Sequence, residues 1–421
     1  MVDKIKKRSQ TDVLGGLKLF ILLSVMTTVF FYLYMLVSLR YATYFGKQLH
    51  SPFFKISDLW ADFFNPIAYA SERRPYEKEW GNSPPFLMFI AYILSFPIKM
   101  GLSKNILYLL YTCVTYIFGA WAICDLLKKY NEGFASRVLC LIVVFFGYPF
   151  MYSFDRGNFI SLTAIVVIWF IWAYDRSNYY LAAVLLGLAA ALKLHPAIFG
   201  VVFLRDKRIK EAAVCAATGI TVSIGTLFFW HGGFIKNLTG FLQKCNSYIK
   251  VGNGGLERLI DDKNSFYQLI LVPKMLSNAP LTDISQVTEY VQYFKIAITI
   301  FMFAVIIVAV CGLKFHDIVL VSAMFCLGYP IESAVYGLTI AVFPVAYWCI
   351  REENNRFIPI LGAFLFLMKS CFVLKYNEMS DTTLQALLNP ICELLIIAYI
   401  IWLRRKDIKR RVTSFRGGLS S

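Results

Sequence analysis

The chain has 421 residues, of which 58% are hydrophobic and only 16% are charged, and its mean hydropathy is +0.60. A soluble domain carries about 25% charged residues, so this composition excludes an ordinary soluble protein. The net charge is +16, but the basic clusters adjoin long apolar runs, which suits anionic lipid headgroups and argues against nucleic acid as a partner.

Apolar runs of about 20 residues recur along the chain and predict an all-α polytopic membrane protein. We expect a single domain over 1–421. The candidate spans are roughly 14–38, 85–100, 105–127, 138–153, 158–174, 179–204, 211–230, 291–313, 317–330, 334–350, 357–375 and 384–403, about eleven or twelve by the usual length rule. Basic residues precede the first run and fill the tail 404–421, so the positive-inside rule predicts that both termini are cytoplasmic.

Two long polar gaps interrupt the apolar runs, at 39–84 and 231–290. With a cytoplasmic N-terminus and six spans between them, both gaps lie on the outer side of the membrane. They contain too many apolar and aromatic residues for plain linkers. We therefore expect two extracytoplasmic loops that carry helices lying in the membrane interface.

The first gap contains an amphipathic segment at 56–67. Its apolar residues recur at helical spacing, whereas Asp58 and Asp62 are four residues apart and share the opposite face. Such a helix would lie flat on the bilayer and hold two carboxylates just above it, where one of them could act as a general base. A second interpretation is a solvated polar face, which fits Asp58 better than Asp62, because Asp62 stands among aromatic residues.

A polar motif at 152–158 separates two apolar runs. Asp155 and Arg156 either pair locally and end two helices, or Arg156 meets a lipid-linked phosphate, for which its planar fork is well shaped. Gly157 would let a backbone come close. A strict count of spans places this motif, with Asn158, on the cytoplasmic side. A split or re-entrant segment before it would place it outside with the two loops, which is the arrangement we favour.

Two more charged positions interrupt apolar sequence. Lys193 lies far inside the run 179–204 and is followed by His195 and a proline. The lysine either snorkels to an interface or supplies a charge for a phosphate leaving group, and the histidine either binds there or only ends a broken helix. Glu332 follows another proline and either binds a sugar hydroxyl or is a solvated acid of a loop.

Several kinds of site find no support in the sequence. The ten cysteines form no CxxC pair and the four histidines are not at metal-ligand spacing, so we predict no metal site. The glycine-rich stretch 252–255 is not followed by Lys and Ser or Thr, so it is a turn and not a phosphate loop. We predict no cofactor.

Taken in order, these residues resemble the C-type glycosyltransferases, and most closely glycosyltransferase family 87, which includes phosphatidylinositol-mannoside mannosyltransferases. The resemblance covers about 14–350. It rests on Asp62-Phe63-Phe64, Ser83-Pro84-Pro85-Phe86, Arg156-Gly157-Asn158, Lys193-Leu194-His195-Pro196, Asn264-Ser265 and Gly328-Tyr329-Pro330-Ile331-Glu332-Ser333. The last motif departs from the family pattern, because Ala334-Val335-Tyr336 replaces its tryptophan and histidines.

The resemblance implies the C-type (GT-C) fold and inverting transfer of mannose or another hexose or pentose. The donor would be a polyprenyl-phosphate sugar and the acceptor a lipid-linked or cell-envelope glycan, outside a bacterial plasma membrane. It implies Asp62 and Asp58 as catalytic residues, Arg156, Lys193 and His195 as ligands of the donor phosphate, and Asp155, Asn158, Asn264 and Glu332 as substrate-binding residues. The alternative function is a lipid-linked oligosaccharide polymerase or flippase.

Overall fold

The computed structural model describes residues 15–45, 59–77, 83–250, 263–276, 284–330, 333–375 and 382–418 as an all-α bundle with one short antiparallel ribbon. The first half contains α2 (Gly16–Phe45), α3 (Ala61–Ser71), η1 (Pro75–Glu77), α4 (Pro85–Lys99), α5 (Lys104–Lys129), α6 (Phe134–Phe146), α7 (Tyr148–Arg156), α8 (Ile160–Asp175), α9 (Tyr179–Leu192), η2 (His195–Gly200) and α10 (Val201–Arg205). The second half contains α11 (Ile209–Leu227), α12 (Gly233–Lys250), α13 (Gln268–Leu276), α14 (Ile284–Gly312), α15 (Phe315–Gly328), η4 (Val335–Leu338), α16 (Thr339–Arg351), α17 (Phe357–Leu365), β1 (Val373–Lys375), β2 (Thr382–Thr383) and α18 (Leu384–Gly418). The predicted all-α class is confirmed.

The protein is an integral membrane protein, but its helices are shorter and more broken than the apolar runs suggested. Within the described residues, four helices have the length and composition of a membrane span, or five if the bent pair α6–α7 counts as one. Six further apolar helices have 10–17 residues. The run 138–153 is divided at Gly147, where the chain turns by 42°, and the run 179–204 is divided at Lys193. A proline follows each break within three residues, which disfavours one continuous helix.

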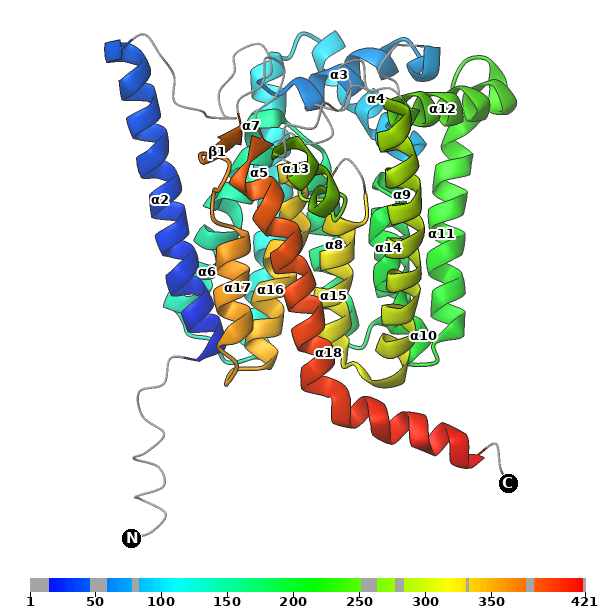
Figure 1. Ribbon diagram of the computed structural model, residues 1–421. Coiled ribbons are helices and arrows are strands. Elements are labelled where there is room, and N and C mark those ends of the chain that lie inside the picture. Colours follow the sequence, from blue (N-terminus) through cyan, green and yellow to red (C-terminus); the bar gives the residue numbers. More distant parts are fainter. Residues whose placement is uncertain are drawn as a thin grey trace.

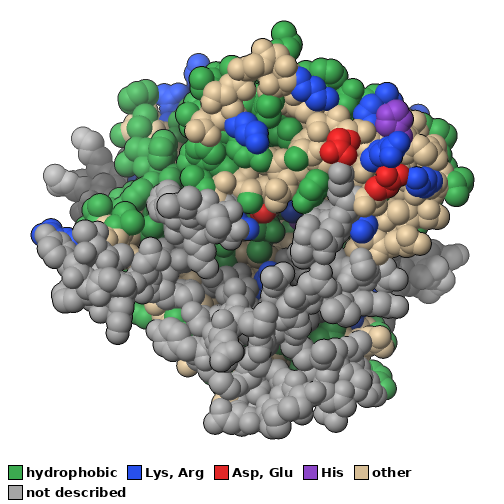
Figure 2. All heavy atoms as spheres, turned by 90° about the horizontal axis from the view of Figure 1, so that it is seen from above, with side chains coloured by type: hydrophobic (Ala, Val, Ile, Leu, Met, Phe, Trp, Pro, Cys, Tyr) green, Lys and Arg blue, Asp and Glu red, His purple; other side chains and the backbone are tan. Residues whose placement is uncertain are grey.

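The helices α3 and α12 lie across one end of the bundle, whereas α2 begins and α18 ends at the opposite end (Figure 1). The helix predicted at 56–67 is present as α3, shifted to Ala61–Ser71, and its position in the membrane interface stays a prediction; residues 46–58 lie outside the described part. Viewed onto this end (Figure 2), most of the charged side chains of the described residues gather on one side. Lys236 of α12 pairs with Glu77 of η1 at 2.6 Å, which joins these two segments.

The small residues of α9 let it pack tightly against α11. A Cβ on Gly187 would lie 2.6 Å from the carbonyl oxygen of Cys215 and 2.7 Å from the Cβ of Thr218, so only glycine fits there. On its other sides α9 contacts α8 and η2. Close packing of this kind fixes the end of α9, and with it the position of Lys193 immediately beyond.

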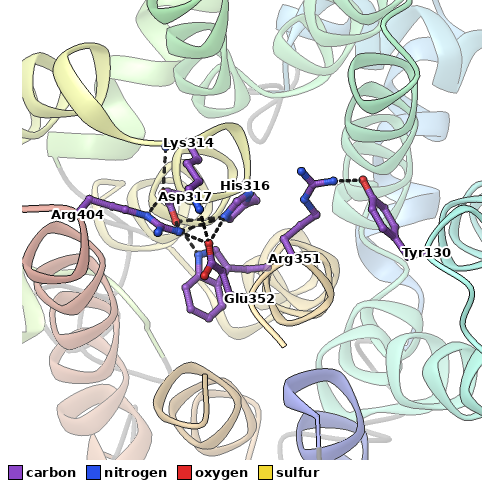
Figure 3. A network of polar contacts seen from close by, with 8 residues as sticks. Tyr130, Lys314, His316, Asp317, Arg351, Glu352 and Arg404 are labelled. Carbon is purple, nitrogen blue, oxygen red and sulfur yellow. Dashed lines mark hydrogen bonds and ion pairs between the residues drawn. The ribbon is translucent and has the colours of Figure 1, made fainter. Parts of the chain in front are cut away.

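A buried polar network fixes the end of the bundle opposite α3 (Figure 3). Asp317, near the start of α15, is completely buried and accepts hydrogen bonds from Trp348 Nε1 at 2.9 Å and Arg404 Nε at 2.7 Å. Arg404 also bonds to Glu352 at the end of α16. The network therefore joins α15, α16 and α18 through charges that have little access to water.

Because a buried charge is costly without its partner, Arg404→Leu should destabilise the protein by about 3 kcal/mol. Thermal unfolding of the detergent-solubilised protein measures this effect. Arg405→Leu, one position along on the exposed side of α18, is the matched control and should have a small effect. Adding Asp317→Asn to Arg404→Leu should recover part of the loss, because the unpaired negative charge is then absent. An unchanged melting temperature in Arg404→Leu would contradict the network's role.

Candidate active site

The start of α3 and the end of α7 meet in a tight joint. The backbone N–H of Trp60, which precedes α3, donates to the carbonyl oxygen of Asp155 at 2.9 Å. Beside it, Gly157 ends α7 in the left-handed region, with φ of 68°. A Cβ on Gly157 would lie 2.9 Å from Trp60 Cα and 2.9 Å from Phe63 Cβ. The close approach predicted for Gly157 is therefore the approach of α3 itself.

An aromatic cluster holds α3 in this position. The ring of Phe63 is completely buried and stacks on Phe159 at 5.2 Å, at the start of α8. It also meets the rings of Tyr108 and Tyr111 of α5 edge-on or tilted, each at 4.9 Å. Tyr108 Oη donates to the carbonyl oxygen of Phe154 at 2.6 Å, which ties α5 to α7. Phe63 thus packs one face of the short α3 against α5 and the start of α8.

Asp62 lies on a different face of α3 and contacts the motif at the end of α7. Asn158 Nδ2 donates to Asp62 Oδ2 at 2.8 Å, and the guanidinium of Arg156 lies 3.7 Å from Asp62 Oδ1. The amide of Asn158 is oriented, because its Oδ1 accepts from the backbone N–H of Ile160 at 3.0 Å. The side chains of Asp62 and Arg156 keep 27% and 24% of their surface exposed, so a substrate can reach both.

A second cation stands at the end of α9. Lys193 follows the last residue of α9 in an extended conformation, and the charge of Asp62 acts on its ammonium group. The ammonium lies 5.4 Å from the ring centroid of Tyr336 in η4. Tyr336 in turn stacks on Tyr152 of α7 at 6.4 Å, with the rings 15° apart. Asp62, Arg156, Asn158 and Lys193 thus form one site, drawn from segments up to 131 residues apart in the sequence.

The remaining predicted residues lie around or outside this group. Asp155 is buried, and its carbonyl oxygen forms part of the joint with Trp60. His195 lies two residues after Lys193, at the start of η2, and its carbonyl oxygen accepts from Cys326 Sγ at 3.3 Å. Asp58 and Glu332 fall outside the described residues.

Asn264 lies apart from the site and its amide is already engaged. Its Nδ2 donates to the carbonyl oxygen of Ala334 at 3.1 Å, and its Oδ1 accepts from Asn389 Nδ2 at 2.7 Å. Its backbone N–H donates to the carbonyl oxygen of Ser333 at 2.7 Å. Asn264 therefore braces the segment that leads into η4, while a direct contact with substrate stays a prediction.

The sequence prediction omitted two kinds of residue. The aromatic pair Tyr152 and Tyr336 carries no spacing signal, since the two rings come from distant segments. A spacing signal does mark the second kind, which consists of buried polar residues of α18. They recur every four residues within an apolar run and so share one helix face: Gln385, Asn389 and Glu393.

In chemical terms, the site combines an accessible carboxylate with two cations of different shape. A carboxylate can take a proton from a hydroxyl group, and an arginine and a lysine can bind a phosphate. Among the described residues, no group of three His, Cys, Asp or Glu side chains gathers as a metal site would. The arrangement fits transfer of a group from a phosphate to a hydroxyl.

Comparison with known proteins identifies the family. The model of glycosyltransferase family 87 matches residues 80–373, about 70% of the chain, including Arg156 and Lys193 but beginning after α3. A curated relative from Mycolicibacterium smegmatis, a polyprenol-phosphate-mannose-dependent alpha-(1-2)-phosphatidylinositol pentamannoside mannosyltransferase, is 26% identical over 132 residues. That alignment covers 30% of this chain and 31% of the relative, so the matched part spans about a third of the relative's length. The chain belongs to glycosyltransferase family 87 and is an integral membrane glycosyltransferase of the C-type fold.

Proposed function

We propose that this glycosyltransferase moves mannose from a polyprenyl-phosphate donor to a hydroxyl group of a lipid-linked glycan. The single observation that carries the proposal is the placement of Asp62 beside Arg156, because the reaction needs a base next to a cation that can bind the donor phosphate. The curated relative supports the donor and suggests a phosphatidylinositol mannoside as acceptor. Family membership favours sugar transfer over the flippase and polymerase functions.

In this mechanism Asp62 is the general base. The acceptor oxygen attacks the anomeric carbon of the donor sugar, its proton passes to Asp62, and the bond between that carbon and the phosphate oxygen breaks. Attack and departure on opposite faces of the sugar invert the anomeric configuration. Asn158 orients the carboxylate through its 2.8 Å hydrogen bond, and the exposed part of Asp62 admits the acceptor. Asp58 and Glu332 are further candidates to contact the sugars. Asp155 is a candidate to hold the end of α7 in place beside α3.

The departing lipid phosphate gains negative charge as the sugar leaves, and Arg156 and Lys193 stabilise that charge. The guanidinium of Arg156 lies 3.7 Å from Asp62 Oδ1, which is longer than a direct hydrogen bond, and its side chain is partly exposed to an incoming phosphate. Lys193 stands over the ring of Tyr336, where its ammonium would meet a second phosphate oxygen. We assign His195 to the same phosphate-binding group as Lys193.

We further propose that the site faces the outside of the membrane. Asp62 lies at the bundle end that carries α3 and α12, whereas the basic residues 404–411 lie at the opposite end (Figure 1). The positive-inside rule assigns that basic end to the cytoplasm. The motif at 155–158 would then be on the outer side. The break between α6 and α7, which precedes the motif, is compatible with this position.

Asp62→Asn should reduce mannosyl transfer by about 10²- to 10⁴-fold, the usual contribution of a general base, while the melting temperature stays close to that of the wild type. Purified protein with polyprenyl-phosphate mannose and a phosphatidylinositol mannoside provides the assay. Glu72→Gln, which removes an exposed acid just beyond the other end of α3, is the matched control. Wild-type turnover in Asp62→Asn would exclude this residue as the base.

Arg156→Ala or Lys193→Ala should each slow transfer by about 10- to 150-fold, because a charge-assisted hydrogen bond contributes roughly 1.5–3 kcal/mol. Lys193→Arg should restore the rate only in part, since the two cations differ in shape. Lys210→Ala, which changes an exposed lysine of α11, is the control. A soluble nucleotide sugar should not replace the lipid donor. Lipid movement across vesicles with no transfer from either donor would instead favour a flippase.

Sidedness can be measured by cysteine labelling in a background without the native cysteines. A cysteine at Gln243, exposed on α12, should react in intact cells with a membrane-impermeant thiol reagent. A cysteine at Lys406, exposed beyond Arg404, should react only after the membrane is opened. The reverse pattern would place the active site in the cytoplasm.

A further inference from the structure

A buried carboxyl group on α18 has no function in the mechanism above. Glu393 is completely buried, and neither of its carboxylate oxygens has a hydrogen-bond partner among the described residues. The cation that interacts with it is Lys369, which is 1% exposed. An ionised carboxylate without a hydrogen-bond donor is very costly in the interior of a membrane protein. The protonation state of Glu393 therefore requires an explanation.

Lys369 cannot supply the missing donor. Its ammonium donates to the carbonyl oxygens of Phe364 at 2.5 Å, Leu365 at 3.3 Å and Leu367 at 3.1 Å. These bonds use all three N–H groups of a lysine and satisfy carbonyls at and just beyond the C-terminal end of α17. Lys369 is therefore a cap of α17, and its hydrogens are not available to Glu393.

A suitable acceptor stands one turn before Glu393. Asn389 is also completely buried, and its Oδ1 has no hydrogen-bond partner in the described part of the chain. The two residues are four apart on α18 and so share one face of the helix. A proton on Glu393 would give Asn389 Oδ1 a donor one turn away and give one oxygen of Glu393 an acceptor.

The contacts of Asn264 determine which atom of Asn389 faces away from it and can accept a hydrogen bond from Glu393. Asn389 Nδ2 donates to Asn264 Oδ1 at 2.7 Å, and Asn264 Nδ2 donates to the carbonyl oxygen of Ala334 at 3.1 Å. A backbone carbonyl can only accept, so Asn264 must present its amide nitrogen to Ala334 and its oxygen to Asn389. Asn389 must then direct its own oxygen away from Asn264.

This chain of bonds ends at the candidate active site. Ala334 immediately precedes η4, whose Tyr336 lies under the ammonium of Lys193. We propose that Glu393 is a protonated carboxylic acid that donates to Asn389 and so starts a directed chain, through Asn264 and Ala334, that positions Tyr336 beside Lys193. Glu393 is a positioning residue in this account. Its effect on turnover rests on the proposed function, whereas its protonation does not.

The protonation state can be tested directly by infrared spectroscopy of the purified full-length protein. The difference spectrum between wild type and Glu393→Gln should show the loss of a carbonyl stretch from a protonated carboxylic acid. The loss of a carboxylate stretch would overturn the proposal. This measurement needs neither substrate nor turnover, so it remains decisive even if the proposed transfer reaction proves wrong.

The positioning role is tested by comparing two substitutions at the same site. Glu393→Gln retains an N–H donor for Asn389 and should transfer mannose within about twofold of the wild-type rate, whereas Glu393→Leu, which leaves Asn389 Oδ1 unsatisfied, should lose about tenfold. The Michaelis constant for the donor should rise in Glu393→Leu, since Lys193 is proposed to bind the donor phosphate.

Asn389→Leu should match Glu393→Leu, and the double variant should be no worse than either, because all three interrupt one chain. Thr163→Val, which removes a completely buried hydroxyl from α8, is the matched control. Equal loss in Glu393→Gln and Glu393→Leu, or an unchanged rate in both, would overturn the positioning role. If Glu393→Leu does not fold, the infrared comparison with Glu393→Gln still decides the proposal.

Discussion

The joint between α3 and α7 is the contact on which the candidate site depends. A single backbone hydrogen bond from Trp60 to Asp155, and the absence of a side chain at Gly157, allow the two backbones to touch. Buried aromatic rings then pack the short α3 against α5 and the start of α8 and hold it in this position. Without this joint, Asp62 would have no fixed relation to Arg156, because an isolated helix of 11 residues is marginal in water.

Charge is distributed differently at the two ends of the bundle. At one end Asp317, Arg404 and Glu352 are paired closely and are largely inaccessible, so their charges offset one another and fasten helices together. At the other end Asp62 and Arg156 are farther apart and partly exposed. Loose pairing leaves part of the electrostatic interaction available to a charged substrate, which is what a transferase acting on a lipid phosphate requires.

Much of the site was predictable from local sequence. Charged residues inside apolar runs are costly in a membrane, and this rule alone selected Arg156 and Lys193. Helical spacing selected Asp62, and Gly157 was recognised as a position of close approach. The boundaries of the helices were less predictable. Hydropathy alone does not show where a helix ends, and the apolar run 179–204 divides at Lys193, three residues before Pro196.

The sequence by itself determined the class of protein, the family and most of the polar residues near the site, because composition, apolar length and ordered motifs are properties of the chain alone. Only the tertiary structure decided which of those residues meet. Asp62 lies before the part matched by the family model, and it reaches Asn158 through packing between segments 96 residues apart. The contacts of Tyr336 with Lys193 and of Asn264 with Asn389 also depend on tertiary structure, since no local spacing in the sequence predicts either contact. Long-range packing sets such contacts, and no pattern within a single helix encodes it.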